Sequence, residues 1–114
     1  MHEMSLISGL FEILERTARE EGAIRVTAVT LRVGRLSGVV PELLETAFDT
    51  FKKDTIAAGA TLRIEVVPVG VRCRSCGAES RTDRPLFSCP GCGAPGLEIL
   101  EGRDLILEKL EIER

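Results

Sequence analysis

Four cysteines, set as two C-x-x-C pairs, constrain this chain more than any other feature of its sequence. They are Cys73, Cys76, Cys89 and Cys92, and the chain has no others. Two such pairs, twelve residues apart, can wrap four thiolates tetrahedrally around one ion, as in a zinc ribbon. Gly77 and Gly93 follow the pairs, where the backbone must turn sharply to aim its amides at sulfur. The sequence therefore predicts a structural Zn(II) site.

Other uses of these thiols remain open on sequence grounds. Two disulfides are typical of secreted chains, and a redox dithiol needs one C-x-x-C near a βαβ pattern. Iron in a rubredoxin-like site, and hence an electron carrier, is a further alternative because C-P-x-C-G knuckles resemble such sites. A closed four-thiolate site leaves no open coordination position, so by itself it predicts no catalysis.

Length and composition limit the rest of the chain. With 114 residues, of which 44% are hydrophobic, there is room for one modest domain, or for one domain plus a small metal-stapled module. The core must be aliphatic, because Trp and Tyr are absent and only four Phe are present. The net charge of −3 argues against a general nucleic-acid binder.

The beginning of the chain does not read as a signal peptide, because it lacks a basic region and Glu12 interrupts its apolar stretch. No run approaches the roughly 20 apolar residues that a membrane helix needs. We therefore expect no membrane partner and a cytoplasmic location, where thiols stay reduced.

Two amphipathic helices are expected from apolar side chains recurring at steps of three and four residues. The first spans residues 4–21, and the second begins at Pro41, a residue suited to the first helical position. The core-facing stripe of the first is Met4, Ile7, Leu10, Phe11, Leu14 and Ala18. That of the second is Leu44, Ala47, Phe48 and Phe51.

Strands are expected at 24–34 and 61–67, where apolar and polar residues alternate. The segment Leu105–Ile112 also mixes the two, but its phase slips between Leu107 and Leu110. Because isolated strands are unstable, this last strand should join the sheet of the first two. The predicted fold is α+β, with two helices packed on a small three-stranded sheet and an inserted zinc-ribbon module. The expected domains are 1–70 plus 101–114, and 71–100 for the module.

The only histidine, His2, lies next to the start of the chain. A solvated side chain is one interpretation. The alternative is a metal site made of the Met1 amine, the amide and ring Nδ1 of His2, and the amide or carboxylate of Glu3. Nitrogen donors in a plane suit Ni(II) or Cu(II) better than Zn(II). Binding there should release protons, so affinity should rise with pH.

Five segments together carry a resemblance to a known family. In chain order they are MHEMSL, VGRLSGVVPE, GATLRIEVVP, the knuckles CRSCG and CPGCG, and LEKLEIE. They resemble, over the full length, the HypA/HybF family of hydrogenase maturation nickel metallochaperones. The resemblance implies transported, labile Ni(II) held by His2 with Met1 and Glu3, and structural zinc on the four cysteines.

The same resemblance implies two protein partners, a HypB-type maturation GTPase and the precursor of the [NiFe] hydrogenase large subunit. We expect a monomer or weak homodimer. We also expect that the chain is not an enzyme, because it has no P-loop motif and no convincing Ser/His/Asp arrangement. No histidine lies beside the cysteines, which argues against the histidine-driven zinc switch of some relatives.

A zinc-ribbon module for nucleic-acid binding or protein interaction is the alternative function. Its charged residues are Arg72, Arg74, Arg81 and Arg84 against Glu79, Asp83 and Glu98. The resulting single net positive charge over 71–100 is a weak basis for binding phosphates. We therefore expect no nucleic-acid partner.

Overall fold

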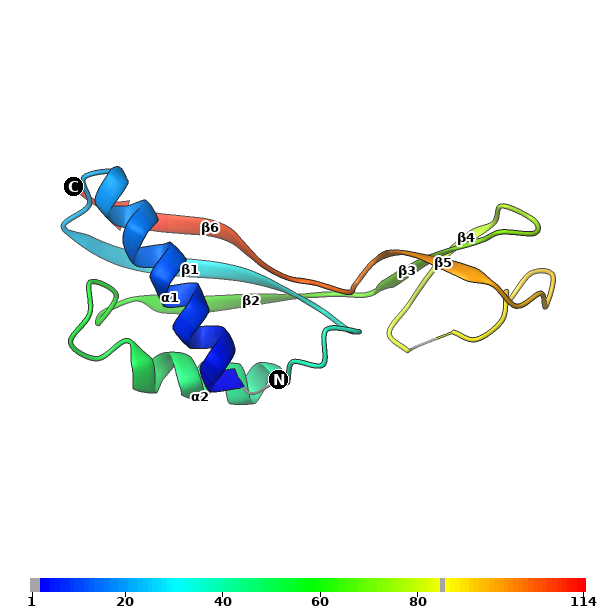
Figure 1. Cartoon of the computed structure of the whole chain (residues 1–114), viewed down its shortest axis with the longest axis horizontal. Coiled ribbons are helices and arrows are strands. Elements are labelled where there is room, and N and C mark those ends of the chain that lie inside the picture. Colours follow the sequence, from blue (N-terminus) through cyan, green and yellow to red (C-terminus); the bar gives the residue numbers. More distant parts are fainter. Residues whose placement is uncertain (1–2, 85) are drawn as a thin grey trace.

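The computed structural model describes residues 3–84 and 86–114, and its elements follow the predicted order. The helices are α1 (Glu3–Glu20) and α2 (Pro41–Phe51). The strands are β1 (Arg25–Gly34), β2 (Thr61–Val67), β3 (Val69–Cys73), β4 (Glu79–Thr82), β5 (Leu97–Glu101) and β6 (Leu105–Glu113). The molecule measures 54 × 25 × 17 Å, with the helices at one end and the small strands β3–β5 at the other (Figure 1).

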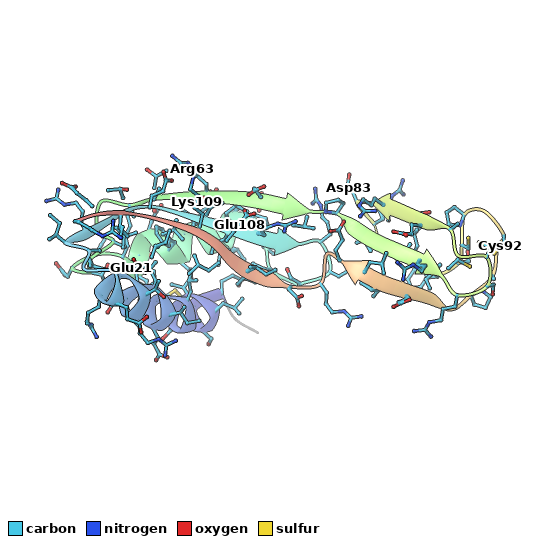
Figure 2. All side chains as sticks on the ribbon, turned by 90° about the horizontal axis from the view of Figure 1, so that it is seen from above. Glu21, Arg63, Asp83, Cys92, Glu108 and Lys109 are labelled. Carbon is cyan, nitrogen blue, oxygen red and sulfur yellow. The ribbon has the colours of Figure 1, made fainter. Side chains whose placement is uncertain are left out.

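The larger sheet has the order β2-β1-β6 and carries both helices on one face. β1 pairs in parallel with β2, and α2 supplies the long crossover that a parallel pair requires. β6 pairs antiparallel with β1, which confirms that the last strand joins the sheet of the first two. Polar side chains such as Arg63 and Lys109 occupy the opposite face (Figure 2). This arrangement confirms the predicted α+β fold.

The apolar stripe of α1 enters the core, with one exception. Its buried side chains are Ile7, Leu10, Phe11, Leu14 and Ala18. The ring of Phe11 lies 5.5 Å from that of Phe48 and 5.0 Å from that of Phe51, between centroids, so aromatic packing joins the helices. The prediction was wrong for Met4, whose side chain is 47% exposed because it borders a surface groove beside α2.

A β-bulge explains the phase slip in the last strand. Thr30 of β1 lies opposite Lys109 while the next residue, Leu31, lies opposite Leu107, so Glu108 is the extra residue. Because of this extra residue, Leu107 and Leu110 lie opposite Leu31 and Val29, which share one face of the sheet. Leu107 and Leu110 consequently both pack against the core.

The second sheet, β4-β3-β5, is antiparallel and has almost no core of its own. Only Pro68 separates β2 from β3. Among the described residues of 69–101, the buried apolar side chains are Val69, Val71, Cys73 and Cys89. Since this is too little buried surface to order some thirty residues, another source of stability is required.

The junction between the sheets is made of closely packed backbone. The N–H groups of residues 34–36 donate to the carbonyl oxygens of Asp104, Val67 and Gly102, at 2.9, 3.0 and 2.7 Å respectively. A Cβ on Gly34 would lie 2.2 Å from the carbonyl carbon and oxygen of Gly102. Gly102 itself has a φ of +94°, which favours glycine. Positions 34 and 102 therefore have no room for a side chain where the strands pass one another.

We expect Gly34→Ala to lower the free energy of unfolding by about 3 kcal/mol, because the new methyl meets backbone that cannot turn aside. The melting temperature should fall by roughly 10–20 °C in thermal unfolding followed by circular dichroism. Gly9→Ala is the control, since its Cβ meets no atom within 4 Å and alanine favours the helix by about 1 kcal/mol. Equal melting temperatures for the two variants would contradict the role assigned to the junction.

Candidate functional site

The structure brings the four cysteines together at the end of the small sheet farthest from the helices (Figure 2). Their sulfur atoms all lie within 4.8 Å of one another, and the thiols are free. The Sγ atoms of Cys73 and Cys92 are 3.6 Å apart, and those of Cys76 and Cys89 are 3.7 Å apart. A tetrahedral ion with bonds of about 2.3 Å to sulfur needs sulfurs about 3.8 Å apart, so the cluster fits such an ion.

Two knuckles of matching geometry position these thiols. In the first, the Gly77 N–H donates to the Cys73 carbonyl at 2.9 Å; in the second, the Gly93 N–H donates to the Cys89 carbonyl at 2.8 Å. Both glycines have positive φ, +77° and +75°, as their place after each pair predicts. The repeated turn explains why the two pairs present their sulfurs alike.

Backbone amides point at one buried sulfur in each knuckle. The Cys73 Sγ accepts from the N–H groups of Ser75 and Cys76, both at 3.4 Å. The Cys89 Sγ accepts from those of Gly91, at 3.3 Å, and Cys92, at 3.4 Å. These donors favour the thiolate over the thiol, because a hydrogen bond to the charged form stabilises it.

The thiols differ in acidity because two of them accept hydrogen bonds from pairs of backbone amides, whereas Cys92 faces neighbouring thiols. The Cys76 amide, opposed by burial, lowers the pKa of Cys73 to about 6. The Cys92 amide likewise lowers the pKa of Cys89. Although the Ala94 amide acts to lower it, the Cys73 thiol and burial together raise the pKa of Cys92 to about 11. Cys73 and Cys89 thus ionise readily, whereas Cys92 resists adding a further negative charge beside them. A bound dication would offset this negative charge and favour the thiolate of Cys92 as well.

Of the three residues predicted to hold nickel, the structure describes only Glu3; Met1 and His2 lie outside the described residues. Glu3 is the first residue of α1, and its Oε2 accepts a hydrogen bond of 3.4 Å from the Val40 N–H. Val40 is the N-cap of α2 and has no side-chain cap of its own. Sequence reasoning missed this contact, because a backbone amide leaves no signal in the sequence.

The arginines of the small sheet are engaged with acids. Arg72 lies 3.5 Å from Glu79 and 3.9 Å from Glu98. Arg81 lies 2.7 Å from Glu101. Such pairs reduce the positive potential that a nucleic-acid surface needs. Within the described ranges, neither helix is long and apolar enough to cross a membrane.

Comparisons with known proteins agree with this architecture. The family model described as hydrogenase/urease nickel incorporation, metallochaperone, HypA matches residues 1–112. A hydrogenase maturation factor HypA from Aquifex aeolicus is 43% identical over 113 residues, which cover 99% of this chain and 98% of the relative. One from Desulfitobacterium hafniense is 42% identical, with 99% of each chain covered.

Among solved structures, the nickel metallochaperone HypA from Helicobacter pylori superposes with a TM-score of 0.72. It is 27% identical, and the match covers 98% of this chain and 97% of that one. The family is defined by metal incorporation and not by a catalysed reaction, in agreement with the expectation of no enzyme. This chain belongs to the HypA family of nickel-incorporation metallochaperones.

Proposed function

We propose that this chain binds Ni(II) reversibly at its leading tripeptide and delivers it to the large-subunit precursor of [NiFe] hydrogenase. The observation that carries the proposal is the separation of two donor sets. The four thiols form a closed cluster at the tip of the small sheet, while Glu3 begins α1, which packs on the larger sheet. A cargo site must be open to exchange, and the closed cluster is not.

The proposed nickel ligands are the amine of Met1, the amide and ring Nδ1 of His2, and Glu3. Such nitrogen donors suit the planar field that Ni(II) favours. The bond from the Val40 N–H already occupies one carboxylate oxygen of Glu3, which supports its amide as the donor. That contact also ties Glu3 to the start of α2.

Zn(II) is the ion that we assign to Cys73, Cys76, Cys89 and Cys92. Four thiolates in a tetrahedron suit zinc and leave no open position, which supports a structural role. We also propose that 71–100 folds as a separate domain, inserted into one formed by 1–70 and 101–114. The sparse burial on the small sheet supports this division.

The proposed partners are the hydrogenase precursor and a HypB-type maturation GTPase, in the cytoplasm, with the chain a monomer or weak homodimer. Transfer needs no chemical reaction in this chain. Cysteine thiolates of an acceptor compete well for nickel and can displace nitrogen donors one at a time.

The test is nickel titration of the untagged, zinc-loaded chain, followed by addition of the large-subunit precursor. We expect a single nickel site with the absorption of square-planar Ni(II), proton release on binding, and passage of the metal to the precursor. X-ray absorption that finds nickel surrounded by sulfur in the chain alone would contradict the proposal.

Blocking the α-amine should weaken nickel capture, because acetylation turns the Met1 donor into a poorly coordinating amide. We expect the absorption of square-planar Ni(II) to be lost or shifted in a titration of the acetylated chain. Zinc content and melting temperature should stay unchanged, since the four cysteines lie in the knuckles of the small sheet and not near α1. An acetylated chain with unaltered nickel spectra would exclude the amine as a ligand.

A further inference from the structure

An apolar groove lies beside the first turn of α1, next to the proposed nickel site. It has a volume of about 270 Å³. Its lining residues are Glu3, Met4, Leu43, Thr46, Ala47 and Thr50. Met4 is 47% exposed and Leu43 52%, although both are large apolar side chains. The helix stripe that builds the core does not include Leu43, so core packing does not account for it.

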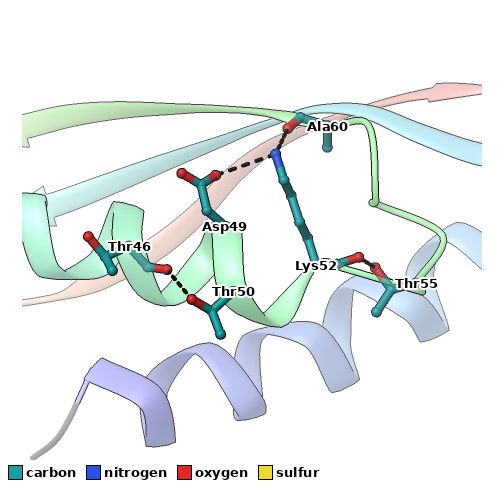
Figure 3. A network of polar contacts seen from close by, with 6 residues as sticks. All are labelled: Thr46, Asp49, Thr50, Lys52, Thr55 and Ala60. Atoms are coloured by element: carbon teal, nitrogen blue, oxygen red, sulfur yellow. Dashed lines mark hydrogen bonds and ion pairs between the residues drawn. The ribbon is translucent and has the colours of Figure 1, made fainter.

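The threonines of the groove make it less polar than the sequence suggests. The Thr50 hydroxyl donates to the Thr46 carbonyl at 3.0 Å (Figure 3). The Thr46 hydroxyl donates to the Glu42 carbonyl at 3.1 Å. Both hydroxyls are thus satisfied within α2. What the groove offers a partner is mainly apolar surface, on which a side chain can be buried.

An acidic stripe borders the groove. Glu42, Glu45 and Asp49 are exposed and lie one residue before the lining positions of α2, on the adjacent helix face. Asp49 pairs with Lys52 at 3.4 Å (Figure 3). Neither Glu42 nor Glu45 forms an ion pair with any residue in 3–84 or 86–114. A complementary partner would carry Lys or Arg here, whereas a second copy would bring like charges together.

We propose that this groove docks the nickel-accepting polypeptide, through an apolar side chain flanked by basic residues and close in space to its cysteines. The inference rests on the proposed function, since it assumes that nickel leaves from the leading tripeptide. Glu3 belongs both to that tripeptide and to the groove wall, so a segment seated in the groove lies beside the metal. Docking and ligand exchange then occur at one place, which raises the effective concentration of the acceptor thiolates.

The test measures binding and nickel uptake by the hydrogenase large-subunit precursor with the Leu43→Glu variant. We expect its affinity for the precursor and its transfer rate to fall tenfold or more, while its own nickel affinity stays unchanged. Leu43→Ala should show a smaller loss in the same direction. Ile13→Glu is the matched control, because Ile13 is a 46% exposed side chain on the side of α1 away from Met4.

A second pair of variants tests the charges. Glu42→Gln with Glu45→Gln should reduce the salt dependence of precursor binding, whereas Glu12→Gln with Glu20→Gln on α1 should not. Wild-type transfer by Leu43→Glu, or an equal loss in Ile13→Glu, would overturn the groove assignment and leave the nickel site standing. So would a dimer that Leu43→Glu dissociates without a change in precursor affinity. A wild-type chain that binds nickel but never transfers it would instead contradict the proposed function.

Discussion

Cys73→Ala is expected to unfold the small sheet while the helices stay folded. Removing one of four thiolates removes most of the metal-binding free energy, on the order of 10 kcal/mol for a structural zinc site. Few apolar side chains are buried in β3–β5 to compensate. The core that contains both helices includes no described residue of that sheet. Hydrogen exchange should show lost protection over 69–73 and retained protection in α1 and β1.

Ser75→Ala is the matched control for this experiment. Ser75 lies in the same knuckle with its side chain exposed, and it contacts sulfur only through its backbone N–H. Zinc content and exchange rates should therefore remain those of the wild type. If Cys73→Ala also abolishes the helical signal in circular dichroism, the two sheets form one cooperative unit and the proposed division into domains fails.

Metal binding at the cysteines should weaken as the pH falls. Without metal, the raised pKa of Cys92, about 11, keeps that thiol protonated at neutral pH, so zinc must displace a proton there. Because the pKa of Cys73 is lowered to about 6, this thiol is already ionised at neutral pH. Metal binding displaces a proton from it only when the pH falls to about 6 or below. Stability supplied by the metal is thus present at neutral and higher pH and is lost on acidification.

His2→Ala is expected to abolish nickel binding at the leading tripeptide. The change removes the imidazole donor and with it the chelate ring that joins this donor to the His2 amide. Loss of even an outer-shell partner costs about 10- to 100-fold in metal affinity, so loss of a ligand should cost at least about 100-fold. Isothermal titration with Ni(II) on the untagged chain measures the effect. Affinity of the wild type should rise with pH, because binding displaces protons from ring and amide.

Ser5→Ala is a suitable control, since Ser5 is an exposed residue of α1 beyond the proposed ligands. Both variants should keep the wild-type melting temperature and zinc content, so a difference between them reports on nickel alone. Unchanged nickel affinity in His2→Ala would remove His2 from the site and with it the proposed planar donor set.

Much of the fold followed from short patterns in the sequence. The C-x-x-C spacing predicted a four-thiol cluster, and the glycine after each pair predicted the turn that forms it. Helical periodicity predicted the buried face of α1, apart from its first turn. Alternation predicted β1 and β2, and the need of a lone strand for a partner placed β6 in their sheet. These features depend on residues close together in the chain or on the obligatory pairing of strands.

Contacts between distant segments were decided only by the tertiary structure. The bulge at Glu108 restores the burial of Leu107 and Leu110, the backbone of Gly34 passes against Gly102, and Glu3 accepts a hydrogen bond from Val40. The exposure of Met4 beside Leu43 has the same origin. The sequence by itself determined which cysteines form a cluster and which residues build the helices and strands, since those preferences are local. Register, close backbone approach and the groove depend on how separate elements pack, which no local pattern encodes.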